Sequence, residues 1–205
     1  MKKYYVGIIL LIVLAIGAWG LNRANPNRAS SNITADKLPY PLERGAERPK
    51  LLTFGLFVSP ELETNPIKPP EEFTGFHTAL DIEILPGEEN SIVEVKTVCT
   101  GDILYADTAE GYGGVIIQSC TIHGQPVSVL YGHIDPASFK VQKGTTGVST
   151  GTVIANLGAH KTEQTGNTRK HLHLGIHKGI EIKMLGYVQT EAELQEYINP
   201  QPLLE

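Results

Sequence analysis

A series of short strand-like runs, with no helical pattern between them, most constrains the fold of this chain. Glycine, proline, asparagine or aspartate separates most of the runs, and these residues end strands and form turns. The predicted strands are residues 81–84, 92–98, 101–107, 114–120, 127–133, 152–157 and 172–177. Short strands joined by turns pair with their neighbours in antiparallel sheets. We therefore expect a mainly β domain, built as an antiparallel β-sheet or a barrel-sandwich-like fold.

The one helix that we expect lies near the C-terminus, over residues 190–198. Thr190 and Glu193 have the spacing of a capping box, in which each side chain bonds the backbone N–H of the other residue. Pro200 follows and would stop the helix. Because strand composition begins at Leu51, the predicted folded domain covers residues 51–205.

The N-terminus carries a long apolar segment. After Lys2 and Lys3, no charged residue occurs from Tyr4 to Leu21. A helix of that length spans about 27 Å, enough to cross the hydrocarbon core of a bilayer. Residues 1–22 are therefore expected to be a transmembrane helix that anchors the chain in the membrane, and a secretory signal peptide is the alternative. Either interpretation places the rest of the chain in the cell envelope, on the extracytoplasmic face of the membrane.

Residues 23–50 are rich in asparagine, serine, proline and arginine and show no period, so we assign them to a flexible linker. The predicted domain, residues 51–205, carries 9 basic and 19 acidic side chains, a net charge of −10. Binding to nucleic-acid phosphates needs clustered lysine and arginine. The charge of the domain therefore predicts that it has no nucleic-acid partner.

The chain has two cysteines, Cys99 and Cys120. In a domain that leaves the cytoplasm, an even pair suggests a disulfide. The strand-like runs between them would form a hairpin that returns one cysteine towards the other. Two buried free thiols are the alternative, because the spacing of Cα atoms cannot be read from a sequence.

Histidines two residues apart, at His171 and His173, give the strongest chemical signal. On a strand both rings leave the same face, about 6.6 Å apart along the backbone, so one can bind a metal ion while the other lies beside it. Upstream, His77 and Asp81 are four residues apart, which is about 13 Å on a straight strand and too far for one ion. The chain must therefore turn at His77, and Gly75 makes such a turn plausible. Two imidazoles and one carboxylate leave tetrahedral zinc one position short, as in a catalytic site.

The order of these motifs, His-x-x-x-Asp, then Gly-His at His133, then His-x-His, resembles the lysostaphin/LytM-type zinc endopeptidases. The resemblance runs from about Phe54 to Leu204. Its motifs are residues 75–82, 129–134, 147–155, 165–167, 171–176 and 199–203. The resemblance implies a metalloendopeptidase that hydrolyses peptide cross-links of bacterial peptidoglycan.

This resemblance also assigns roles to residues. It implies one Zn²⁺ per chain, held by His77, Asp81 and His173. His171 and His133 would flank the reacting water, as general base and as donors to the tetrahedral oxyanion.

Three features depart from the family pattern. Ala79 replaces the usual glycine of the first motif, and the loop 158–170 before the His-x-His is longer and more polar than usual. This loop is expected to border the groove, so it bears on substrate preference. The sequence offers no counterpart of the upstream tyrosine that some relatives place near the scissile bond.

The remaining candidates have simpler interpretations. His123 and His160 lie in a turn and a loop, and His177 would lie about 13 Å beyond His173 on the strand, outside any ligand set. Tyr131 is expected to be a packed strand aromatic whose hydroxyl faces the cleft. We also consider that residues 51–74 lie across the groove and supply a fourth ligand.

The rival function is a catalytically silent domain of the same family that binds and activates other cell-wall hydrolases. Such relatives lack ligand residues, whereas all five site positions are filled here. A lipoyl-like β-barrel adaptor is a weaker rival, since such a barrel does not need the histidines. The sequence therefore favours the enzyme.

Overall fold

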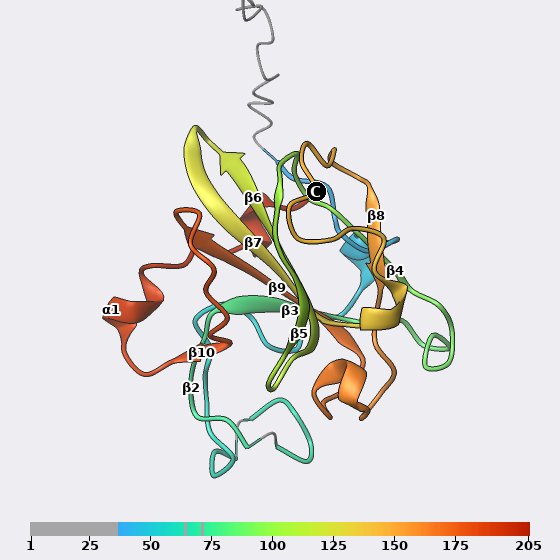
Figure 1. The fold of residues 1–205 in the computed structure, drawn as a ribbon. Coiled ribbons are helices and arrows are strands. Elements are labelled where there is room, and N and C mark those ends of the chain that lie inside the picture. The colour runs from blue at the N-terminus through green and yellow to red at the C-terminus, as the bar shows by residue number, and fades with distance from the viewer. Residues whose placement is uncertain (1–36, 64, 71) are drawn as a thin grey trace, which may run out of the picture. The chain divides into compact units, whose positions relative to one another are not determined.

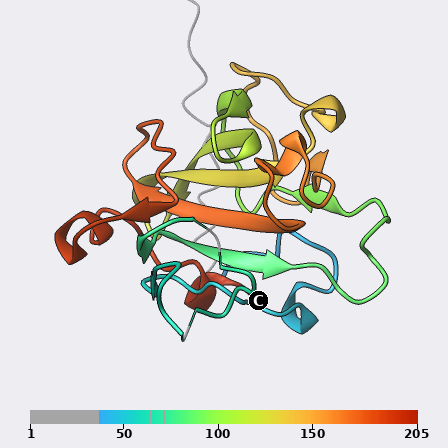
Figure 2. The same ribbon diagram turned by 90° about the horizontal axis from the view of Figure 1, so that it is seen from below.

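The computed structural model describes residues 37–63, 65–70 and 72–205. A five-stranded antiparallel sheet, in the order β3-β9-β7-β6-β5, forms the centre of this part of the chain (Figure 1). Its strands are β3 (Ala79–Glu83), β5 (Ile103–Ala109), β6 (Gly113–Ile122), β7 (Gln125–Ile134) and β9 (His171–Lys178). Figure 2 shows β7, β9 and β3 side by side, as yellow, orange and turquoise arrows.

Two smaller antiparallel sheets accompany the central one. The first has the order β1-β2-β10, and its strands are β1 (Phe57–Val58), β2 (Gly75–His77) and β10 (Tyr187–Val188). The second pairs β4 (Glu94–Lys96) with β8 (Val153–Asn156). The prediction of a mainly β, antiparallel fold is confirmed, and each predicted strand corresponds to an observed one with ends shifted by one or two residues.

Strict alternation along the central strands separates the core from the functional face. Successive side chains on a strand point to opposite faces, and every residue of β3 is buried. The hydrophobic core takes Leu80, Ile82, Val127, Val129, Tyr131, Leu172, Leu174 and Ile176. Asp81, His171 and His173 therefore lie together on the opposite face of the same sheet.

The predicted helix over residues 190–198 is wrong in length. The capping box of Thr190 and Glu193 is present, but α1 covers only Glu191–Leu194. After it the chain returns to the edge of the sheet, where the backbone N–H of Ile198 donates to Ile176 and Tyr197 bridges to His177. Pairing with β9 therefore overrides the local preference for helix beyond Leu194.

The folded unit begins before Leu51. Leu42, in the stretch that we assigned to the linker, is buried, and Leu38 pairs with Leu204 near the C-terminus. Short 3₁₀ helices occur at Gly45–Glu47, Pro136–Ser138, Glu163–Thr165 and Gln201–Leu203. The expected transmembrane helix, residues 1–22, lies outside the described residues. Within the described part of the chain, no helix has the length and apolarity needed to cross a membrane.

Two core details bear on the sequence analysis. Cys99 and Cys120 form a disulfide with a Cα–Cα distance of 6.1 Å, and both belong to the hydrophobic core. The expectation that the hydroxyl of Tyr131 faces the cleft is wrong, because this side chain is fully buried. Its hydroxyl accepts from the backbone N–H of Val98 and donates to Gln118, so Tyr131 packs the core.

Candidate metal centre

The pairing of β3 with β9 brings Asp81 opposite His173. Directly opposed residues on one face have Cβ atoms about 5 Å apart, so their side chains can reach a common point. In the structure, Nδ1 of His173 lies 3.1 Å from Oδ1 of Asp81. The two side chains are buried.

A break in the strand brings His77 to the same point. β2 ends at His77 and β3 begins at Ala79, and the two strands belong to different sheets. Between them, Thr78 donates its backbone N–H to Gly186 and its hydroxyl to Leu185, which fixes the bend. Nε2 of His77 consequently lies 3.2 Å from Oδ1 of Asp81, instead of the distance expected on a straight strand. The expected turn near His77 is therefore present.

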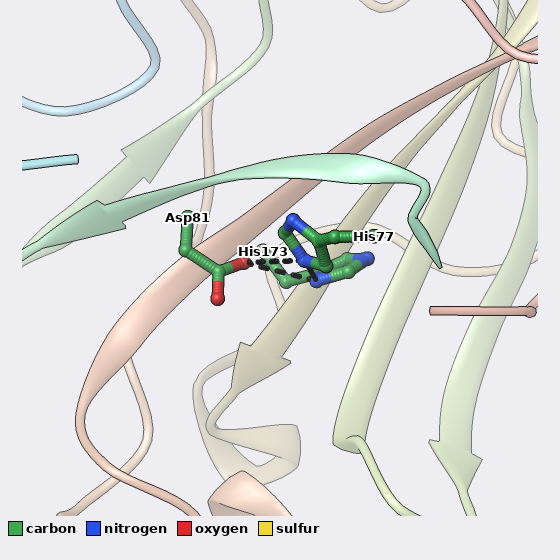
Figure 3. A group of neighbouring side chains, drawn as sticks. All are labelled: His77, Asp81 and His173. Atoms are coloured by element: carbon green, nitrogen blue, oxygen red, sulfur yellow. Dashed lines mark hydrogen bonds and ion pairs between the residues drawn. The ribbon is translucent and has the colours of Figure 1, made fainter. Parts of the chain in front are cut away.

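Figure 3 shows the side chains of His77, Asp81 and His173 converging. The distance from Nε2 of His77 to Nδ1 of His173 is 3.2 Å, so the three donor atoms form a nearly equilateral triangle. Ligands about 2.0 Å from a tetrahedral zinc ion are about 3.3 Å apart. The donor set and its spacing therefore fit one face of a zinc tetrahedron, and the group has the composition of a metal site.

The outer hydrogen bonds fix which nitrogen faces the centre. Nδ1 of His77 lies 3.3 Å from the carbonyl oxygen of Thr53, and donating there leaves Nε2 with its lone pair. Nε2 of His173 lies 3.3 Å from the hydroxyl of Tyr112, which leaves Nδ1 for the centre. Partners of this kind hold metal-binding imidazoles in one tautomer and one orientation.

The protonation states of Asp81 and His173 suit metal binding. Burial alone would raise the pKa of Asp81, but His77, His171 and Arg169 outweigh it and hold the pKa well below its usual value. The carboxylate is thus ionised. Burial lowers the pKa of His173 to about 4, although Asp81 opposes this, so its ring is neutral near pH 7. Ionised carboxylate and neutral imidazole are the forms that bind metal.

A β-bulge directs His133 to the same face. The β6–β7 register pairs Val115 with Gly132 and Gly114 with Ile134, which leaves His133 as the extra residue. Its φ is 62°, in the left-handed region. Tyr131 and Ile134 both lie in the core, so strict alternation would have buried His133 among them. The bulge turns the ring towards His171 instead, with ring centroids 4.4 Å apart.

His133 is held with its lone pair at Nε2. Its Nδ1 lies 3.0 Å from the carbonyl of Tyr112 and 2.9 Å from that of Thr165, and both oxygens can only accept. Burial, followed by the neighbouring His171 and His173, lowers the pKa of His133 well below its ordinary value. Nδ1 of His171 likewise lies 2.8 Å from the carbonyl of Arg169. Both histidines line the cleft described next.

The cleft beside the centre has a volume of about 300 Å³. Its polar lining residues include Asp81, His133, His171 and His173, and its apolar ones include Phe73, Met184, Leu185 and Tyr187. A second hollow of about 570 Å³ lies between residues 67–73 and 160–169 and shares Phe73 and Thr168 with the first. The long loop 158–170 thus borders the groove, as the sequence analysis expects.

Of the described residues in 51–74, none joins the metal group, so the structure does not support a fourth ligand from this segment. The segment instead carries the Thr53 carbonyl that faces His77. His177 also lies outside the group. Its ring packs on Tyr197, and its buried Nδ1 has no hydrogen-bond partner in the part of the chain that the structure describes.

Sequence reasoning missed two residues at the site. Tyr112 is buried, packs against the rings of His133 and His173, and reaches Nε2 of His173 with its hydroxyl. Its setting between Gly111 and Gly113 suggested only a turn. Arg169 donates to Asp81. The sequence indicates this position of Arg169 through the alternation of Arg169, His171 and His173, which places all three on one face of a continued strand.

Comparison with known proteins adds the context. The model of peptidase family M23 matches residues 75–186. The catalytic domain of the antimicrobial peptidase lysostaphin from Staphylococcus simulans has a TM-score of 0.50 and 18% identity, over 77% of this chain and 92% of its own. A solution structure of lysostaphin has a TM-score of 0.52 and 17% identity, over 84% of this chain and 57% of its own. LytU has a TM-score of 0.49 and 22% identity, over 76% of this chain and 83% of its own. A search of curated proteins finds no match.

Proposed function

Because this chain belongs to peptidase family M23, we propose that it is a zinc-dependent endopeptidase that hydrolyses peptide cross-links of bacterial peptidoglycan. The observation that carries the proposal is the convergence of three metal-binding donor atoms, 3.1–3.2 Å apart, beside two histidines that face the same cleft. A site built only for stability needs neither the cleft nor the two additional histidines.

The donor set defines the proposed chemistry. His77, Asp81 and His173 would hold one zinc ion, which supplies Lewis-acid activation of water and of the scissile carbonyl. Three protein ligands leave a tetrahedral site one position open, as catalysis requires.

His133 and His171 supply proton transfer in this proposal. The Nδ1 proton of His133 is held by two carbonyl oxygens, so its Nε2 is free to accept a proton from the attacking water. The carbonyl of Arg169 orients His171 at Nδ1, and Nε2 of His171 lies 3.3 Å from Oδ2 of Asp81. Once one ring is protonated it can donate to the tetrahedral oxyanion or to the departing amine, as a general acid does.

Tyr112 supports the same chemistry as a hydrogen-bond donor. Burial raises its pKa, so the hydroxyl keeps its proton at neutral pH. Because this hydroxyl oxygen accepts from Nε2 of His173, its own proton remains available towards the cleft, which Tyr112 lines. A peptide carbonyl bound there would receive that proton in a hydrogen bond.

The shape of the surface suits a peptide substrate. The cleft and the adjoining hollow share Phe73 and Thr168, so an extended chain can pass from one to the other. The apolar lining residues Met184 and Leu185 offer contact for small aliphatic groups. A peptide that cross-links peptidoglycan is extended and carries such groups.

We place the protein in the cell envelope, on the extracytoplasmic face of the membrane. The apolar segment from Tyr4 to Leu21 supports export. The disulfide between Cys99 and Cys120 supports it independently, because such bonds persist in oxidising compartments.

The test is digestion of purified peptidoglycan by the full-length chain, with mass spectrometry of the released fragments. His171→Ala serves as the inactive control, and His123→Asn, in the exposed turn between β6 and β7, as the active one. We expect new peptide termini with the wild type and His123→Asn, and none with His171→Ala. If zinc-loaded wild type released nothing, the proposal would fail in favour of a silent domain that acts on other hydrolases.

A further inference from the structure

Arg169 lies over the carboxylate that belongs to the metal group. Its Nη2 is 2.6 Å from Oδ2 of Asp81, while the other oxygen, Oδ1, is the one that faces His77 and His173. The two oxygens of Asp81 therefore have different partners. Side-chain exposure is 13% for Arg169 and 2% for Asp81, so water competes little for this bond.

Glu83 anchors the same guanidinium group. Nε of Arg169 lies 3.1 Å from both oxygens of Glu83, and Nη2 lies 2.9 Å from Oε1. Asp81 and Glu83 are two residues apart on β3 and share one face. One arginine thus bridges two neighbouring carboxylates with a rigid planar fork, which a lysine ammonium cannot reproduce.

The arrangement matters because a carboxylate can bind a metal ion with one oxygen or with two. If Asp81 offered both oxygens, it would occupy the position that a catalytic zinc site leaves open. In the structure Oδ2 is already engaged by a charge-assisted hydrogen bond from Arg169, and Nε2 of His171 lies 3.3 Å from it. Glu83 is turned to Arg169 as well, which keeps a second carboxylate away from the ion.

We propose that Arg169 is a positioning residue that restricts Asp81 to one-oxygen coordination and thereby keeps one metal position open. The inference rests on the proposed zinc site and concerns its geometry, not the reaction catalysed. Arg169 also offers its backbone carbonyl to Nδ1 of His171. One residue therefore orients a metal ligand through its side chain and a cleft histidine through its backbone.

The experiment replaces zinc with Co²⁺ in the full-length protein and records the visible absorption spectrum. Four-coordinate Co²⁺ absorbs strongly, and a fifth donor weakens the bands and shifts them to shorter wavelength. We expect the strong bands in the wild type. Arg169→Gln and Arg169→Lys should both show the weaker, shifted bands, because Oδ2 of Asp81 is released to the ion. Arg169→Lys keeps the positive charge and provides the test if Arg169→Gln does not fold.

Lys170→Gln is the matched control. Lys170 is the neighbouring buried cation, but its Nζ donates to backbone carbonyls of Glu88, Glu89 and Ser91 and not to Asp81. We expect the spectrum of the wild type from this variant even where its stability falls. Spectra of both Arg169 variants that match the wild type would overturn the inference and leave the zinc site standing. A wild type that binds no Co²⁺ would remove the site itself.

Discussion

The backbone conformation of His133 decides whether one histidine or two line the cleft in addition to the metal group. The left-handed bulge at this residue takes its ring out of the core and places it 4.4 Å from the ring of His171. Neither ring belongs to the metal group. At the scale of the residue, binding and proton transfer are thus assigned to different side chains.

That division gives the first prediction. His133→Ala and His171→Ala should each retain the metal but lower kcat by about 10²–10⁴-fold, the usual contribution of a general acid or base. The measurement is the rate of release of new amino termini from peptidoglycan, normalised to bound zinc. Either variant with wild-type kcat would show that its histidine takes no part in proton transfer.

Some residues of the site can be predicted from the sequence, and others cannot. His77, Asp81 and the pair His171 and His173 are visible in the order and spacing of their motifs, since a metal needs these residue types. The choice of His173 as the ligand came from the family resemblance. Tyr112 and Arg169 do not, because their roles come from a turn that packs against the site and from a bond across the sheet. A turn motif such as Gly-Tyr-Gly-Gly does not state what the tyrosine will touch.

At the scale of the element, the start of β6 supports the loop that holds His133. Gly113 has a φ of +70°, and a Cβ added there would lie 2.1 Å from the carbonyl oxygen of Gln164. Gln164 belongs to the 3₁₀ helix Glu163–Thr165, and the carbonyl of Thr165 faces Nδ1 of His133. The glycine thus permits the close approach that orients the histidine.

Gly113→Ala should therefore destabilise the fold by about 1–3 kcal/mol and lower kcat more than it lowers zinc content. Gly111→Ala is the matched control, because Gly111 has a φ of +77° but no atom lies near its added Cβ. Urea unfolding and turnover give the two readings. Equal effects of the two substitutions would show that backbone strain alone, and not the clash with Gln164, is responsible.

The loop between β3 and β4 is stabilised through Glu88. Its carboxylate accepts from the buried guanidinium of Arg48 and from the backbone N–H of Leu85. The hydrogen bond from Arg48 is the main reason that the pKa of Glu88 lies below its ordinary value of 4.5. The ionised form is therefore preferred in the folded state.

Glu88→Gln should destabilise the protein by about 1–2 kcal/mol at pH 7, because it leaves the charge of Arg48 without its counterion. Since the folded-state pKa is lowered, this stabilisation is complete above pH 4.5 and is lost as the pH falls through the folded value. Urea midpoints of wild type and variant should converge at low pH. Exposed Glu89→Gln is the control, and a gap that persisted in acid would contradict the account.

Elements were predictable where alternation and turn residues agree, and not where tertiary pairing intervenes. The strands of the central sheet follow from their composition. The helix beyond Leu194 does not form, because residues 196–198 pair with β9. The two-residue strands Phe57–Val58 and Tyr187–Val188 are too short to show a period in the sequence.

At the scale of the whole molecule, the disulfide joins the segment before β5 to β6 over a sequence separation of 21. Closing a loop of this size stabilises a fold by about 3 kcal/mol. Cys99→Ala combined with Cys120→Ala should lower the free energy of unfolding by that amount in urea titrations while zinc binding remains. An unchanged unfolding midpoint would show that the bridge is not formed in the protein.

A single zinc ion held by His77, Asp81 and His173 is the central property that we propose for this protein. The direct measurement is zinc content by inductively coupled plasma mass spectrometry of the wild type, His173→Gln, Asp81→Asn and His177→Gln. His177 lies on the same strand as His173 but outside the metal group, so it is the matched control. We expect one zinc per chain in the wild type and in His177→Gln, and its loss in the other two. A wild type without zinc, or His173→Gln that retains it, would contradict the account.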